Sequence, residues 1–239
     1  MKIDYPIRLQ SYLAKCGAGS RRSCEKLITD GRVMVNNKVV LELGTKVNED
    51  DIVYVDDVLA EVADKTYYFM LNKPRGYVCT NHDPNETAYA RDLIDIPERN
   101  LLFNVGRLDK DSQGLILFTN DGEFSNLITH PSSETEKEYI VRVDRDLQKK
   151  DLDDAYRGLV KPYRIRAYRI ISNREVSVVL TEGKNREIRR LFDYLGYDVK
   201  KLTRIRIGSV KLGDLPTGQY RKLTPAEVRS LERDAGRKE

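Results

Sequence analysis

A carboxylate and a guanidinium lie two residues apart in the stretch Asn104–Gly122, which reads NVGRLDKDSQGLILFTNDG. Gly106 precedes Asp109 and Gly114 follows it, and each glycine permits a sharp backbone turn. The segment between them is therefore expected to be a loop that presents Arg107 and Asp109. A carboxylate can act as a nucleophile or as a general base, and a neighbouring guanidinium suits an anionic substrate. The stretch thus predicts a catalytic loop centred on Asp109.

Two other interpretations of this stretch use the same residues. Asp109, Asp111 and Gln113 stand at the first, third and fifth positions of a calcium-binding EF-hand loop. The twelfth position is Asn120, where a bidentate glutamate is required, and the flanks are typical of a loop and a strand rather than two helices. A polar β-turn is the other alternative, because Asp and Gly favour turns for conformational reasons alone. The stretch by itself leaves that alternative open.

The elements that would hold this loop can be read along the chain. A covered strand is expected over Leu115 to Thr119, directly after the loop. The pattern predicts further strands over 138–143, 175–180 and 198–207, helices over 121–129 and from about 186 to 195, a last helix that begins with a capping box at Thr224, and a disordered tail over 234–239. Tyr67 to Leu71 is a strand that leads into a turn over 72–76, and 82–91 is expected to be a loop.

The run GRLDKDSQGLILFTNDG at Gly106–Gly122 resembles the active-site motif of the RsuA family of ribosomal RNA pseudouridine synthases. Further matches occur in the family's order: LNKPRGYV at Leu71–Val78, THPSSETEKEYIV at Thr129–Val141, and LTEGKNREIRRLFDYLGYDVKKLTRIRIG at Leu180–Gly208. Ser112 stands where Thr is commoner, and Glu187 where Gln is usual. The resemblance covers nearly the whole chain. It implies an α+β fold whose catalytic domain has a mixed, mainly antiparallel β-sheet with flanking helices.

By this resemblance Asp109 is the catalytic residue, Tyr139 lies against the target uracil, and Arg189 pairs with the catalytic carboxylate. An aromatic residue on a strand would otherwise be assigned to the core. A flipped base, however, needs an aromatic face to replace its lost stacking. A guanidinium beside Asp109 would keep the carboxylate charged. Arg107 is the candidate for the side chain that fills the space vacated by the base.

Basic residues at three further places are candidates for contacting the RNA backbone, although each could also be solvated surface charge. Clustering favours the first interpretation, because residues 1–38 carry a net charge of +5, residues 39–66 of −6 and residues 184–222 of +7. The candidates are Arg21 and Arg22 at the start of a predicted helix, Lys73 and Arg75 in a predicted turn, and Lys184, Arg186 and Arg190 around another predicted helix start.

The first sixty residues predict a separate small domain. Two helices, over Arg8–Cys16 and from Ser20 to about residue 30, precede a hairpin at Asn36-Asn37 and a strand near Ile52–Val55. The pattern RLxxYLAxxGxxSRRxxxxLIxxGRVxVN at residues 8–36 resembles the S4 RNA-binding domain. We therefore expect an S4-like domain over 6–62 and a catalytic domain over 67–233, joined by a short polar linker.

Composition limits the remaining possibilities. Three cysteines and two histidines, His82 and His130, give no spacing typical of a metal site, so neither a metal nor another cofactor is expected. The hydrophobic fraction is 40% and the first residues lack an apolar segment, which favours a cytoplasmic monomer that does not enter a membrane.

The sequence thus predicts a cofactor-free enzyme that flips a uridine out of folded ribosomal RNA and isomerises it to pseudouridine. Whether Asp109 acts as nucleophile or as base stays open. DKDSQGL at Asp109–Leu115 resembles the large-subunit members of the family more than the small-subunit member, so 23S RNA is the expected target. The alternatives are a synthase for 16S or transfer RNA and a non-catalytic RNA-binding factor in ribosome assembly.

Overall fold

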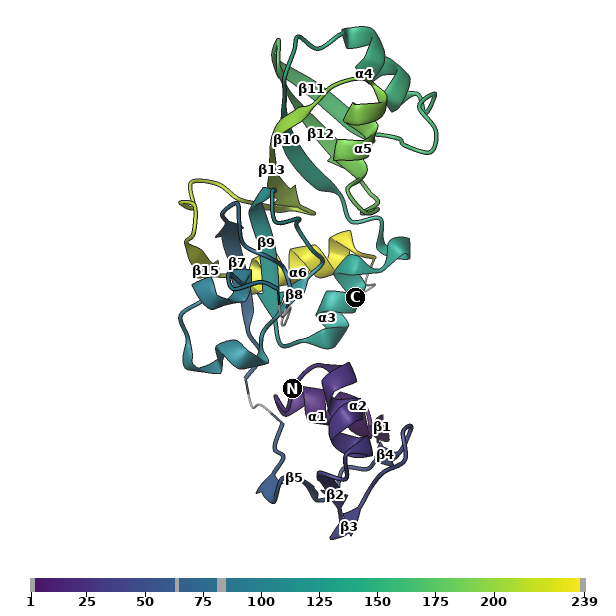
Figure 1. The fold of residues 1–239 in the computed structure, drawn as a ribbon, viewed down its shortest axis with the longest axis vertical. Helices are drawn as coiled ribbons and strands as arrows, with labels where there is room; N and C mark the ends of the chain where they lie inside the picture. Colours follow the sequence, from purple (N-terminus) through teal and green to yellow (C-terminus); the bar gives the residue numbers. More distant parts are fainter. Residues whose placement is uncertain (1–2, 63–64, 81–84, 237–239) are drawn as a thin grey trace. The chain divides into compact units, whose positions relative to one another are not determined.

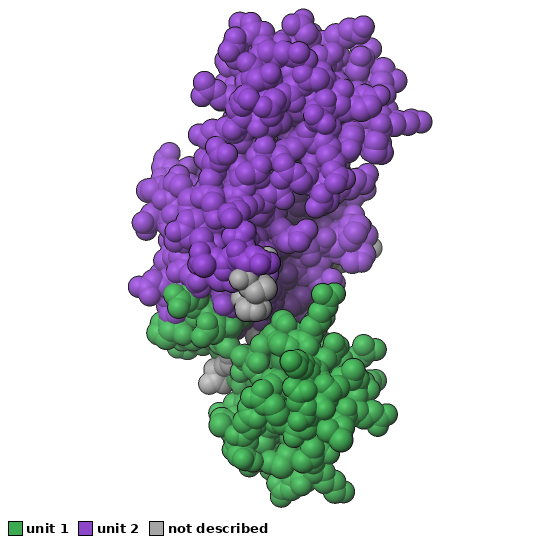
Figure 2. Space-filling view, in the orientation of Figure 1, with its two compact units in different colours: residues 1–67, 97–102 green, residues 68–96, 103–239 purple. Residues whose placement is uncertain are grey.

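The computed structural model describes residues 3–62, 65–80 and 85–236. The chain divides into two compact units, which are coloured separately in Figure 2. Unit 1 comprises Met1–Tyr67 and Pro97–Leu102, and unit 2 comprises Tyr68–Ile96 and Phe103–Glu239. Each unit contains hydrophobic core residues of its own.

Unit 1 has the predicted order of two helices followed by a small sheet. The helices are α1 (Leu9–Lys15) and α2 (Arg21–Thr29), and the Ser20 side chain caps α2 by accepting a hydrogen bond of 3.1 Å from the Ser23 backbone nitrogen. The strands are β2 (Val33–Val35), β3 (Lys38–Val39), β5 (Val53–Val55) and β6 (Val58–Leu59) in the order β3-β2-β5-β6, with β1 (Ile7–Arg8) paired to β4 (Lys46–Val47). The 3-10 helix η2 (Pro97–Leu101) also belongs to this unit.

Unit 2 is built on one mixed sheet, in which nine strands are described. Its order is β11-β12-β10-β13-β9-β7-β15, with β14 on β13 and β8 on β9. The strands are β7 (Tyr68–Lys73), β8 (Phe103–Val105), β9 (Gln113–Thr119), β10 (Lys137–Val143), β11 (Ala167–Ser172), β12 (Glu175–Leu180), β13 (Val199–Ile207), β14 (Val210–Lys211) and β15 (Tyr220–Lys222). Within this described sheet β9 and β13 run parallel, whereas the other paired strands are antiparallel. The predicted α+β class is confirmed.

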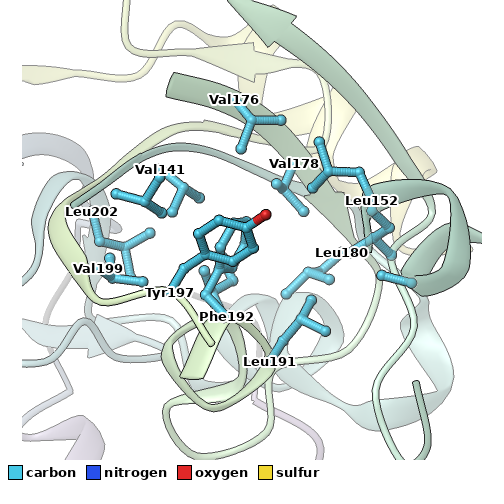
Figure 3. Packing of buried hydrophobic residues seen from close by; sticks show 14 of the residues in the cluster. Val141, Leu152, Val176, Val178, Leu180, Leu191, Phe192, Tyr197, Val199 and Leu202 are labelled. Atoms are coloured by element: carbon cyan, nitrogen blue, oxygen red, sulfur yellow. The ribbon is translucent and has the colours of Figure 1, made fainter. Parts of the chain in front are cut away.

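Two cores cover different parts of this sheet (Figure 1). On β10, β12 and β13 the helices α4 (Lys149–Tyr156) and α5 (Glu187–Tyr194) bury an apolar cluster, in which Phe192 and Tyr197 pack among aliphatic side chains (Figure 3). On β7 and β9 the helices α3 (Gly122–Thr129) and α6 (Pro225–Asp234) bury a second cluster that includes Phe124 and Leu231. The short β9–β13 pairing lies between the two cores and joins them.

Gly114 allows β9 to approach β13 at this junction. A Cβ atom at Gly114 would lie 2.2 Å from the carbonyl oxygen and 2.8 Å from the nitrogen of Arg204, and the residue has a φ of +103°. Backbone at such a distance cannot yield to a side chain, so only glycine fits. The Asp109 loop directly precedes β9. The close approach at Gly114 therefore places this loop beside Arg204 on β13.

Most of the predicted elements of unit 2 are confirmed. The strand predicted over 175–180 matches β12, the predicted helix 121–129 is α3, and Thr224 begins α6 with a complete capping box. The tail predicted from Asp234 is wrong at its start, because Asp234 ends α6 and its carboxylate accepts a hydrogen bond of 2.5 Å from the Ser209 nitrogen. Residues 237–239 lie outside the described part.

The loop predicted over 82–91 lies partly outside the described residues, and Ala90–Leu93 forms the 3-10 helix η1. The helix α4 and the strand β11 were not predicted. None of the helices in the described ranges is long and apolar enough to span a bilayer.

Candidate active site

A pocket of about 660 Å³ opens in unit 2 between the loop that follows β8 and the connection from β12 to α5. Two groups of side chains border it. The loop wall consists of Asp109 and Arg186, which line the pocket, together with Asp111 and Arg189 behind them, and the sheet wall consists of Lys137, Tyr139 and Arg204. The volume is in the range of sites that enclose a small organic ligand.

Asp109 lies in a turn, and its backbone carbonyl oxygen accepts a hydrogen bond of 3.0 Å from the Ser112 nitrogen. A bond of 2.7 Å from the Gly76 nitrogen to the Lys110 carbonyl holds the same loop to the turn after β7. The Asp109 carboxylate is 36% exposed, and its Oδ2 lies 3.5 Å from Nη1 of Arg186. It is therefore accessible from the pocket and only loosely paired.

The predicted pair between Arg189 and Asp109 is wrong in this structure. Arg189 donates hydrogen bonds to the carbonyl oxygens of Asp111, at 3.2 Å, and Val199, at 3.0 Å, and it pairs with the Asp111 carboxylate at 3.2 Å. Burial lowers the pKa of its guanidinium, and Asp111 opposes that shift. Arg189 thus ties the loop to β13, and Arg186 is the guanidinium beside Asp109.

Arg186 reaches the loop because of an unusual backbone. It is the N-cap of α5 and has a φ of 51°, a left-handed conformation that is uncommon for a residue with a side chain. Its Nη1 lies 3.4 Å from the Asp111 carboxylate as well as 3.5 Å from Asp109. Arg186 was predicted only as an RNA-binding residue, and its place beside the carboxylates was missed.

The position of Lys73 in the structure contradicts its predicted role as a phosphate contact. It is the last residue of β7 and is fully buried, with its ammonium donating to the carbonyl oxygens of Pro74 at 3.0 Å and Tyr77 at 2.8 Å. Burial lowers the pKa of this amine. Lys73 therefore ties together the turn after β7, while Arg75 in that turn is exposed.

On the sheet wall, the Tyr139 ring packs against the core around β10, and the Arg204 guanidinium carbon lies 5.9 Å from its centroid. Arg204 is buried, and its Nε donates to the Leu115 carbonyl at 2.7 Å. Its Nη1 lies 3.4 Å from the Arg107 carbonyl and 3.5 Å from the Tyr139 hydroxyl. The pKa of Lys137 is lowered to about 8, chiefly by burial and also by Arg204, while Glu187 opposes the shift.

The sequence did not single out Lys137 or Arg204 as site residues. Alternation along β10 does place Lys137 on the face of Tyr139, which is a signal that could have found it. Arg204 stands opposite Tyr139 in the β10–β13 register, a pairing across 65 residues that local pattern does not contain.

The other predicted residues divide between the pocket and the surface. Arg107 and Lys184 line the pocket, Arg190 on α5 is exposed and donates to Asn185 at 3.0 Å, and Arg21 and Arg22 are exposed at the start of α2 in unit 1. Glu187 is buried and accepts a hydrogen bond of 3.1 Å from the Lys184 nitrogen, and burial raises its pKa. Among the residues that the structure describes, no three His, Cys, Asp or Glu side chains are grouped as a metal ion would require.

Known proteins resemble this chain in both units. Residues 67–194 match the family model of RNA pseudouridylate synthases, and residues 7–53 match the S4 domain. The chain belongs to the RNA pseudouridylate synthase family, and it is a pseudouridine synthase that acts on RNA.

Three relatives illustrate the similarity. Ribosomal large subunit pseudouridine synthase B of Bacillus subtilis is 38% identical over 94% of this chain and 95% of its own length. An uncharacterized RNA pseudouridine synthase of Mycobacterium leprae is 40% identical over 96% of this chain and 94% of its own. A crystal structure of a pseudouridylate synthase aligns with a TM-score of 0.69 at 31% identity, covering 94% of this chain and 99% of that one.

Proposed function

We propose that this enzyme isomerises a uridine of large-subunit ribosomal RNA, and that Asp109 acts at the sugar of a nucleotide flipped out of the RNA. The observation that carries the proposal is the accessible Asp109 carboxylate in a pocket that it shares with the Tyr139 ring. The large-subunit target is supported by the name of the Bacillus subtilis relative and by the resemblance of the Asp109 loop to large-subunit members of the family.

The reaction breaks the bond between uracil N1 and sugar C1′ and joins C1′ to uracil C5 instead. A stacked nucleotide gives no access to these atoms, so the base leaves the stack and enters the pocket. Asp109 then attacks C1′, as the nucleophile of a retaining glycosidase does, or removes a proton from the neighbouring C2′. Both routes use the Asp109 carboxylate as the attacking or proton-accepting group, and Nη1 of Arg186 lies 3.5 Å from its Oδ2.

Two side chains have supporting roles in this mechanism. The Tyr139 ring offers a face against which the flipped uracil stacks. Arg107 is exposed at the pocket and precedes Asp109 by two residues, so its side chain can occupy the space that the base leaves in the RNA.

Unit 1 contributes RNA affinity through the start of α2. Arg21 and Arg22 are exposed there, where backbone amides already favour a phosphate. Replacing both by Gln should weaken RNA binding and reduce the slope of log affinity against log salt by about 1.5, since each lost phosphate contact removes ~0.7 to 0.9. Binding measured over a salt series checks this. The charge-matched control Lys38→Gln with Lys46→Gln changes two exposed lysines of unit 1 and should leave the slope in place.

The target is tested by treating separate naked large-subunit RNA, small-subunit RNA and transfer RNA with the purified enzyme and mapping pseudouridine at nucleotide resolution. Modification of the large-subunit RNA is expected. Modification confined to either of the other RNAs would overturn the target while leaving the chemistry intact.

A further inference from the structure

Two cations of the sheet wall have no carboxylate at ion-pair distance within the described ranges. Arg204 is only 4% exposed, and its Nη2 has no hydrogen-bond partner there. Its other nitrogens reach neutral oxygens, namely the carbonyls of Leu115 and Arg107 and the hydroxyl of Tyr139. A buried charged donor without a partner costs folding free energy, so this group points to a ligand that the pocket receives.

Lys137 adds a second charge to the same wall. It lines the pocket two residues before Tyr139 on β10, and its ammonium makes no hydrogen bond or ion pair with the residues that the structure describes. The carboxylates of the pocket are engaged elsewhere. Asp109 lies beside Arg186, Glu182 pairs with Lys184 at 2.5 Å, and Glu187 accepts a backbone hydrogen bond. An excess of positive charge therefore remains beside the Tyr139 ring.

We infer that Arg204 and Lys137 stabilise the negative charge that uracil carries while it is detached from the sugar. The inference rests on the proposed function, in which uracil lies against Tyr139. Hydrogen-bond donors that are already in place where charge develops stabilise a transition state without having to reorganise. Exclusion of water strengthens their interaction with that charge. Their partner is the pair of carbonyl oxygens and N1 of the uracil anion.

The charge arises whichever role Asp109 takes. As a nucleophile, an Asp109 oxygen bonds to C1′ while the C1′–N1 bond breaks. As a base, Asp109 accepts the C2′ proton and a C1′=C2′ double bond forms as the C1′–N1 bond breaks. In both routes the electron pair of the broken bond leaves with uracil and is shared by N1 and the carbonyl oxygens.

The charge is consumed when uracil C5 bonds to C1′. That step releases Asp109 from C1′ or returns the proton to C2′. C5 then loses its proton and N1 gains one, so the product is an isomer of the substrate. The cations of the sheet wall are thus needed only between bond breaking and bond formation.

Protonation of Lys137 gives this inference a signature. Its pKa is lowered to about 8 by burial and by Arg204 from β13, against the effect of Glu187 from the start of α5. The other charged or titratable side chains around the pocket are Arg107, Asp109, His130, Tyr139, Glu182, Lys184 and Arg186. Because the ammonium is the useful form, the chemical step should slow as pH rises through about 8.

The experiment measures single-turnover pseudouridine formation by the full-length enzyme, in excess over a large-subunit RNA transcript, from neutral to alkaline pH. Lys137→Gln should slow the step ~100-fold at neutral pH, as removal of one charge-stabilising donor does, and abolish the alkaline decline. Lys137→Arg should retain more activity and move the decline to higher pH. Lys150→Gln, an exposed lysine on α4, is the control and should keep the wild-type profile.

Arg204→Lys is the complementary variant. Because Arg204 also donates a hydrogen bond to the Leu115 carbonyl, thermal unfolding is used to check that this variant is folded. The two variants Lys137→Gln and Lys137→Arg test the inference without the Arg204 variant. A wild-type rate and pH profile for Lys137→Gln, or a defect confined to RNA affinity, would overturn the inference. Wild-type inactivity on the large-subunit transcript would instead overturn the proposed target, and the same variants would then be compared on the RNA that the enzyme does modify.

Discussion

On the loop wall of the pocket each carboxylate lies near a guanidinium, whereas the cations of the sheet wall have no carboxylate within ion-pair distance among the described residues. Asp109 and Asp111 are 36% and 38% exposed and lie 3.5 and 3.4 Å from Arg186. Arg204, in contrast, is buried and bonded to neutral oxygens. The loop wall is therefore nearly neutral and, apart from Arg189, exposed, whereas the sheet wall is positive and contains the buried Arg204.

The two walls differ in how firmly they are held. Exposed ion pairs contribute little to stability, so the Arg186 pairs of the loop wall can rearrange when RNA enters, while Arg189 keeps the loop tied to β13. The sheet wall is held by the β10–β13 ladder, which sets Tyr139 opposite Arg204. We infer that the reactive group belongs to the adaptable wall, and the fixed electrostatic field to the rigid one.

Asp109→Asn should have the largest effect on activity. The amide is nearly isosteric, so fold and RNA affinity should be kept, but it can serve neither as nucleophile nor as base. A loss on the order of 10⁴-fold or more is expected, comparable to removal of an essential catalytic group. Pseudouridine formation under single-turnover conditions measures it. Asp111→Asn, on the same wall, is the control and should lose far less; comparable product from the two variants would refute the role of Asp109.

Gly114→Ala tests the junction that holds the two walls together. The new Cβ would meet the Arg204 backbone at 2.2 Å and would hold φ at +103°, so the free energy of unfolding should fall by about 3 kcal/mol or more. Gly213→Ala is a matched control, because Gly213 has a φ of +58° but nothing within 4 Å of its Cβ position. Denaturant midpoints compare them. Equal midpoints would mean that β9 and β13 can separate at little cost.

The elements that the sequence predicted well are those whose signals are local. Asp121 accepts bonds from the first turn of α3, and Thr224 with Glu227 forms the capping box of α6. In contrast, β11 is exposed along most of its length and lacks the alternation of a half-buried strand. The helix α4 begins with the charged run KKDLDD, and over its whole length it buries only Leu152 and Ala155.

The sequence predicted many of the residues that surround the pocket, but it predicted fewer of the contacts between them. Lys73 was predicted to contact the RNA backbone from a turn, because the sequence pattern does not show that two carbonyl oxygens accept hydrogen bonds from its ammonium. Arg186, rather than Arg189, lies beside Asp109, and the positive φ of Arg186 before α5 is not visible in the sequence pattern. The contact of Arg204 with Tyr139 depends on register between distant strands. Such contacts are properties of the folded sheet, not of sequence pattern.

Tyr139 should show an intermediate effect that separates ring from hydroxyl. Tyr139→Phe keeps the ring and loses only the hydroxyl, which lies 3.5 Å from Arg204. Tyr139→Ala also loses the face for the base, worth ~1 to 3 kcal/mol of stacking. RNA affinity and single-turnover rate are measured for both. If the two variants bind and react alike, Tyr139 is a core residue and the sheet wall does not receive the base.

The two guanidinium groups of the loop wall should affect stability to different extents, and Arg186 should give the smallest effect of all. Arg189 is largely buried and satisfies the carbonyls of Asp111 and Val199, so Arg189→Met should lower the free energy of unfolding by about 1 to 3 kcal/mol. Arg189→Lys should lose less, because it keeps a charge opposite Asp111 though not the planar fork. Arg186→Met removes only exposed pairs, so its effect on stability should be at most ~1 kcal/mol. Thermal unfolding of the three variants, with activity measured alongside, tests this order. If Arg186→Met proved the more destabilising, the loop wall would depend on its exposed pairs, and the contrast between an adaptable and a rigid wall would fail.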